Sequence, residues 1–140
     1  MINRYTAPVF AAPDRFFQVM RTSRTHTQLW LQSDAAPDSG HPLRLEVLFQ
    51  WVHYMCLPFT LRGLTVRAAT PAERDRLAAA HGLEVSAEQG VYLLSEEHDW
   101  FVVASGSPLW AEARLSYSDE SVFWDHAADE DVVVSVATMA

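Results

Sequence analysis

A single clear helix signal stands among many short apolar segments. In Thr70-Pro71-Ala72-Glu73, Thr is a good N-cap, Pro suits the first helical position, and Glu can return a hydrogen bond to the cap amide. The signal predicts a short helix over 71–81 that ends at Gly82. Parallel strands need a crossover of a dozen or more residues, which one helix supplies at most once. The remaining segments, joined by short links, are therefore expected to pair antiparallel.

The longest apolar stretch, residues 43–70, is expected to be the scaffold. Over 43–56 apolar residues recur at every second position, which predicts one long strand with Leu45, Val47 and Phe49 on its buried face. A break at 57–59 and a turn or bulge at Gly63 precede a second strand. Further strand-like segments are 15–22 and 26–32, linked by Ser23-Arg24-Thr25, then 91–94, 100–104, 109–117, 122–125 and 131–138.

These patterns predict a single domain, residues 1–140, of the α+β class. It should be a mainly antiparallel sheet, strongly curled or sandwich-like, with one short helix near residues 71–81. A chain of 140 residues with 49% apolar content can bury a core without metal or disulfide support. The one cysteine, Cys56, allows no internal disulfide. Neither a signal peptide nor a membrane span is recognisable, so we expect a cytoplasmic protein without membrane contact.

The net charge of −8 is unevenly distributed. Residues 1–83 carry nine arginines and six acids, whereas residues 84–140 carry one arginine and twelve acids. The overall negative charge argues against nucleic acid as a partner, because phosphate contacts dominate such binding. An acidic surface instead favours a protein partner or a homo-oligomer, by analogy of charge with the immunity proteins that neutralise nucleases.

Two tryptophans fall on the polar face of their segments. Trp30 alternates with Gln28 and Gln32, and Trp110 alternates with Glu112. Either another layer covers them, or they anchor an interface. The binding residues expected for an acidic, aromatic surface are Trp30, Trp110, Glu112, Asp119, Glu120, Asp129, Glu130 and Asp131.

Motifs for chemistry are weak, and no cofactor is expected. His53 and Cys56 are three apart in a predicted strand and so point to opposite faces, which argues against a catalytic pair. A weak alternative is a metal site formed by two loops, with Glu97, His98, Asp125 and His126 as ligands. We favour binding over catalysis. The competing hypothesis is a small-ligand-binding or hydrolytic protein with a His/carboxylate pocket in a curled sheet.

Overall fold

The computed structural model describes residues 1–22, 27–126 and 128–140, apart from the side chains of Arg21, Asp125 and His126. The predicted link Ser23-Arg24-Thr25 lies outside these residues. The strands are β1 (Asn3–Ala7), β2 (Val9–Thr22), β3 (Leu29–Ser33), β4 (Arg44–Phe49), β5 (Val52–Cys56), β6 (Thr60–Ala68), β7 (Gly90–Leu93), β8 (Phe101–Ala104), β9 (Leu109–Ala113) and β10 (Val133–Met139). Helix α1 spans Pro71–His81, a 3-10 turn spans Pro37–Ser39, and a π-helical turn spans Val122–His126.

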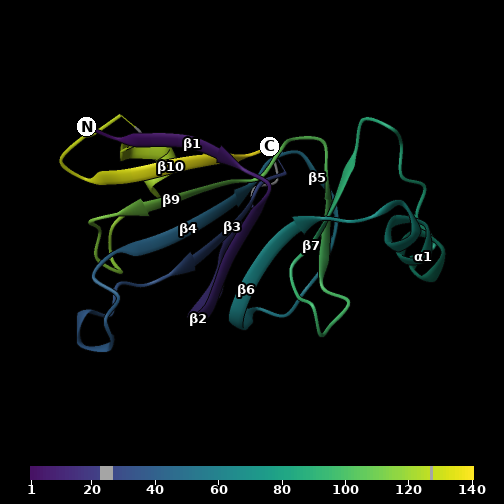
Figure 1. Ribbon diagram of the computed structural model, residues 1–140, viewed down its shortest axis with the longest axis horizontal. Coiled ribbons are helices and arrows are strands. Elements are labelled where there is room, and N and C mark those ends of the chain that lie inside the picture. The colour runs from purple at the N-terminus through teal and green to yellow at the C-terminus, as the bar shows by residue number, and fades with distance from the viewer. Residues whose placement is uncertain (23–26, 127) are drawn as a thin grey trace.

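All ten strands form one sheet in the order β1-β10-β9-β4-β3-β2-β6-β7-β8-β5. Every pair is antiparallel except β1 with β10, which run parallel and join the two ends of the chain. In Figure 1, α1 lies at the end of the molecule occupied by β5 and β7, away from β1 and β10. The predicted α+β class with a largely antiparallel sheet is confirmed, and the sheet does not close.

Helix α1 begins and ends where the sequence predicts. The amide of Glu73 donates to Thr70 Oγ1 at 3.2 Å, and Glu73 Oε1 accepts from the Thr70 amide at 2.9 Å. Gly82 ends the helix with a left-handed φ of 64°. Leu77 is its one buried residue and packs against β7 and β8. A helix this short is held by that packing and by its cap rather than by its own propensity.

Glu73 also ties the helix to the sheet, since Arg67 Nη2 lies 2.8 Å from Glu73 Oε2. The bonds from Arg67 and from the Thr70 amide lower the pKa of Glu73 to about 2 from its ordinary value of 4.5. Because the pKa is lower in the folded state, ionised Glu73 stabilises the fold fully at pH values above 4.5. This contribution is lost as the pH falls from 4.5 toward 2.

Glu73→Gln is therefore expected to destabilise the protein at neutral pH, with a difference from the parent that shrinks as the pH falls from 4.5 toward 2. Urea unfolding at a series of pH values measures this. The exposed Glu88 supplies a control, Glu88→Gln, with little expected effect. If the difference in unfolding free energy between Glu73→Gln and the parent stays constant across this pH range, the lowered pKa of Glu73 is contradicted.

The predicted long strand over 43–56 is wrong. It breaks at Trp51, whose φ of 55° is left-handed and redirects the chain. As a result β4 lies between β3 and β9, whereas β5 pairs with β8 at the far end of the sheet. The alternation continues on both sides of the break, so the pattern alone does not reveal it.

Two other differences from the predicted elements concern the ends of the chain. The sequence patterns miss β1 and the first half of β2, where Pro8 and Pro13 argue against a strand. The predicted strand over 122–125 is a π-helical turn instead. This turn belongs to the long connection between β9 and β10, residues 114–132.

A buried ion pair fastens that connection to β4. Arg44 and Glu46 are fully buried, with Arg44 Nη1 3.1 Å from Glu46 Oε2. The Arg44 guanidinium also donates to the carbonyl oxygens of Ser116, Asp119 and Glu120. Glu46 in turn accepts from the Ser121 hydroxyl at 2.6 Å and from the Val122 amide. The face of β4 opposite Val47 and Phe49 is thus buried as well, in a polar contact with the connection.

Candidate functional site

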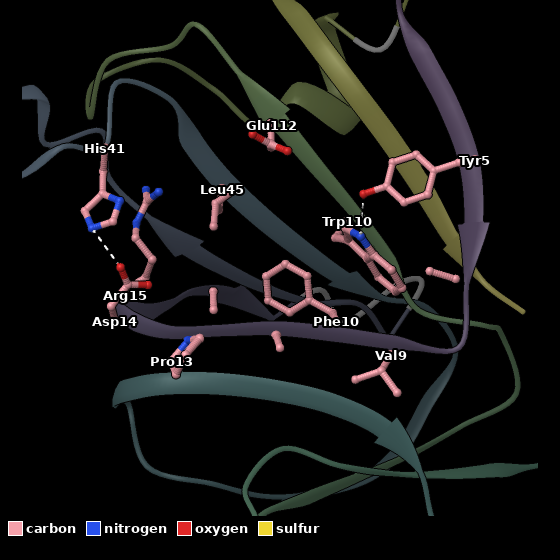
Figure 2. Close-up of a pocket in the computed structure, with 13 residues that line it drawn as sticks. Tyr5, Val9, Phe10, Pro13, Asp14, Arg15, His41, Leu45, Trp110 and Glu112 are labelled. Atoms are coloured by element: carbon pink, nitrogen blue, oxygen red, sulfur yellow. Dashed lines mark hydrogen bonds and ion pairs between the residues drawn. The ribbon is translucent and has the colours of Figure 1, made fainter.

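We call the sheet face that carries the largest core cluster the inner face. Its buried side chains come from β2, β3, β4, β6, β8, β9 and β10 and include Phe17, Leu31, Phe49 and Val66. At one end of this face lies a pocket of about 410 Å³. It is lined by Tyr5, Ala7, Val9, Phe10, Ala11, Ala12, Pro13, Asp14, Arg15, His41, Leu45, Trp110 and Glu112 (Figure 2).

A bulge in β2 directs Arg15 to the inner face. Ala12 pairs with Leu64 and Phe16 pairs with Arg62, so three residues of β2 face the single residue Gly63 of β6. The alternation changes across this bulge, because Phe10 and Ala12 are buried before it and Arg15 and Phe17 are buried after it. Gly63 has a φ of 80°, and a Cβ there would lie 2.7 Å from the Pro13 carbonyl oxygen. Only glycine fits beside this bulge.

Arg15 holds the loop between β3 and β4, which forms one wall of the pocket. Its Nε donates to Ser33 Oγ at 3.0 Å. Its Nη2 lies within hydrogen-bond distance of the carbonyl oxygens of Ser33, Asp34 and Leu43. The side chain is only 8% exposed, and burial lowers the pKa of its guanidinium, while the nearby carboxylates, Asp14 first, oppose that shift.

The opposite end of the pocket is aromatic. The rings of Phe10 and Trp110 lie 5.5 Å apart between centroids. Trp110 Nε1 donates to the hydroxyl of Tyr5, on β1, at 3.4 Å. Figure 2 shows Arg15 and His41 at one end, Tyr5 and Trp110 at the other, and Phe10 between them.

Glu112 adds a carboxylate to the pocket. It pairs with Leu45 across β4 and β9, and its Oε1 accepts from the Ser135 hydroxyl at 3.3 Å. Asp14 and His41 lie 3.5 Å apart and face one another (Figure 2). Among the described residues, neither Arg15 nor Glu112 has an ion-pair partner within 4.0 Å. The pocket therefore presents two opposite charges, neither of them in an ion pair with a described residue, beside the rings of Phe10 and Trp110.

The two predicted surface tryptophans are both covered, each with an exposed fraction of 5%. Trp30 lies edge-on to Trp124, from the β9–β10 connection, at 5.0 Å. Helix α1 does not take part. The alternative of an exposed aromatic anchor is therefore wrong for Trp30, because the connection supplies the second layer.

Both faces of β9 are covered, including the face that the sequence marks as polar. Trp110 joins the main core, and Glu112 follows it on the inner face. Ala111 and Ala113 lie under the β9–β10 connection, in a cluster with Val122 and Val133. Small side chains let this connection approach the strand closely. Trp110 and Glu112 thus remain candidate binding residues, but in a pocket and not on an acidic surface.

The predicted acidic residues lie in the β9–β10 connection. The five side chains are exposed, namely Asp119, Glu120, Asp129, Glu130 and Asp131. The Asp119 carboxylate accepts from the Ser116 amide at 2.7 Å, and that of Asp129 accepts from the Asp131 amide at 3.0 Å. Two of the acids therefore stabilise local turns. The structure brings none of the five into the pocket.

The weak metal alternative involves two loops at opposite ends of the molecule, after β7 and after β9 (Figure 1). Glu97 and His98 are exposed, and the His98 ring stacks on Trp100 at 4.4 Å. The side chains of Asp125 and His126 lie outside the described part of the structure. Within that part, no three His, Cys, Asp or Glu residues form a group that could hold a metal ion.

The sequence patterns do not predict a site formed by the four polar pocket residues Tyr5, Asp14, Arg15 and His41. The sequence carries one relevant signal. Pro13-Asp14 interrupts the segment of β2, and a glycine, Gly63, interrupts the segment of β6. Together these residues predict a bulge but not its position. The pocket also depends on β1, which the sequence does not reveal as a strand.

Comparison of the chain with known protein families, characterised proteins and solved structures gives no match. In the described residues, no helix has the length and apolar character to cross a membrane.

Proposed function

We propose that this protein binds a small molecule in the pocket between β1, β2, β4 and β9. The supporting observation is the arrangement of its lining, where the apolar side chains of Phe10, Leu45 and Trp110 meet the convergent polar groups of Arg15, His41 and Glu112, as in ligand sites generally. In this proposal the sheet curls about its core, as the sequence predicts, and leaves one end of its inner face uncovered. A volume of about 410 Å³ suits a ligand of amino-acid size.

The same lining favours binding over catalysis. His41 and Asp14 resemble a base with its orienting carboxylate, but the pocket-lining residues include no Ser, Thr, Cys or Lys. The lining therefore gives this base no serine, threonine, cysteine or lysine nucleophile to activate, which speaks against catalysis of the Ser–His or Cys–His type. We therefore propose a small-ligand-binding protein, which is part of the competing hypothesis drawn from the sequence.

Ligand-observed NMR with a set of small aromatic fragments tests this proposal. Filling the pocket with Leu45→Trp should abolish the saturation transfer seen with the parent protein, because Leu45 lines the pocket wall. Phe59→Trp is the matched control, since Phe59 is 83% exposed and outside the pocket. Tyr5→Ala, at a half-exposed position on β1, provides a second variant that removes an aromatic contact without overfilling the core.

Binding that survives both Leu45→Trp and Tyr5→Ala, or no binding by any fragment, would contradict the proposal. Thermal unfolding of each variant shows whether a loss of binding reflects a loss of fold.

A second candidate function is the docking of a basic protein or a second copy on the acidic connection. The observation that favours it is the exposure of the five acids between residues 119 and 131 whose side chains the structure describes. In the part of the chain that the structure describes, Arg15, Arg44, Arg67, Arg74 and Arg76 all bond within the protein. Replacing Asp119, Glu120, Asp129 and Asp131 by Asn, Gln or Ser should abolish capture of a partner, and unchanged capture would contradict this candidate.

A further inference from the structure

The charge on Arg15 is not neutralised by a contacting carboxylate. The side chain is 8% exposed, and its Nε and Nη2 are taken up by neutral oxygen atoms of the β3–β4 loop. Among the described residues, Nη1 has no hydrogen-bond partner. A buried cation without an ion pair is costly, and burial disfavours its charge. The pocket beside Arg15 therefore offers an anionic group a positive charge that Asp14, Glu112 and Asp34 compensate only from a distance, without an ion-pair contact.

Glu112 supplies a negative charge to the same pocket. Its carboxylate accepts one bond, from the Ser135 hydroxyl, and it lines the same pocket beside Trp110 and Tyr5. Carboxylates and aromatic faces both attract ammonium groups. In Figure 2, Glu112 lies across the pocket from Phe10, on the side that leads to Tyr5.

A ligand with one charge would satisfy only half of this arrangement. An anion on Arg15 would be repelled by Glu112 and by Asp14. A cation on Glu112 would leave Arg15 without a partner and closer to another positive charge. A zwitterion satisfies both groups at once, and its apolar body can lie on Phe10, Leu45 and Trp110.

We propose, on the basis of the proposed function, that the ligand is a small zwitterion of the amino-acid class with an apolar side chain. Its carboxylate accepts from Arg15 Nη1, and its ammonium group donates to Glu112. The aromatic floor holds the side chain, so that an aromatic or large aliphatic amino acid fits best. His41 and Asp14 face one another at the rim, so neither residue is required to contact the ligand.

Isothermal titration with four probes of similar apolar body tests the class of ligand. These are L-phenylalanine, 3-phenylpropanoate without the amine, 2-phenylethylamine without the carboxylate, and neutral 2-phenylethanol. Because a hydrogen bond to a charged group contributes about 1.5–3 kcal/mol, L-phenylalanine should bind at least about tenfold more tightly than each of the others.

Glu112→Gln supplies the matched variant, because it keeps the side-chain shape and removes the charge. It should weaken L-phenylalanine and 2-phenylethylamine about tenfold or more, and leave 3-phenylpropanoate unchanged or tighter. Glu97→Gln, at an exposed position outside the pocket, should change none of the four affinities. Arg15 is not varied, because its loss would also release the β3–β4 loop.

Equal affinity for all four probes, or a Glu112→Gln protein that binds L-phenylalanine as the parent does, would overturn the zwitterion while leaving a functional pocket. Fragment binding without any L-phenylalanine binding would also overturn the ligand class alone. If neither the fragments nor L-phenylalanine bind, the proposed function falls as well.

Discussion

Replacing Arg44 by methionine is expected to lower the free energy of unfolding by about 3–5 kcal/mol. The substitution leaves Glu46, which is fully buried, without its cation. It also removes the donor for three carbonyl groups of the β9–β10 connection. Methionine fills much of the same volume, so the loss would come from electrostatics and hydrogen bonding and not from a cavity.

Urea unfolding measures this effect, and Arg114→Met is the matched control. Arg114 begins the same connection but is exposed, so its replacement should change the free energy of unfolding by no more than about 0.5 kcal/mol. The double variant Arg44→Met, Glu46→Leu should be more stable than Arg44→Met alone, because it removes the orphaned charge. Equal stability of Arg44→Met and the parent would show that this pair does not hold the connection.

Replacing Gly63 by alanine is expected to cost about 2–5 kcal/mol, the sum of left-handed strain and an overpacked contact. The new Cβ would lie 2.7 Å from the Pro13 carbonyl oxygen, which is backbone and cannot rotate away. Since the bulge beside Gly63 aims Arg15 at the pocket, ligand binding should weaken together with stability.

Gly40→Ala separates the two contributions. Gly40 has a similar φ of 81°, but a Cβ there would meet nothing within 4 Å. This control should therefore show only the left-handed strain of about 1–2 kcal/mol. If the two alanine variants lose equal stability by urea unfolding, the close contact with Pro13 is not what fixes the bulge.

Local signals in the sequence predicted the parts of the fold that are locally determined. The capping residues of α1 act through bonds to neighbours three positions away, so Thr70 and Glu73 indicate the helix without knowledge of the rest. Alternation likewise identified Val47 and Phe49 of β4 as core residues, although the other face of this strand is buried as well. Which strands neighbour each other depends on contacts distant in sequence, and the parallel pair of β1 with β10 has no local signature.

The candidate site was predicted only in part, for a related reason. Trp110 and Glu112 were selected because they share one face of a strand, and that grouping is correct. Their surroundings come from Tyr5, Arg15 and His41, which distant segments and an irregular bulge bring together. A regular period-two pattern places Arg15 and Phe17 on one face of β2 and Phe10 and Ala12 on the other. The bulge between these two pairs brings all four residues to the same face, and the pattern does not reveal this.

The most direct test of the central claim is a map of ¹H–¹⁵N chemical-shift changes on addition of L-phenylalanine. Binding in the pocket predicts shifts of the Phe10, Leu45 and Glu112 amides and of the Trp110 indole N–H, with little change in α1 or in the 95–99 loop. Shifts confined to α1, to that loop or to the β9–β10 connection, with the Trp110 indole unmoved, would contradict a ligand site at the uncovered end of the inner face.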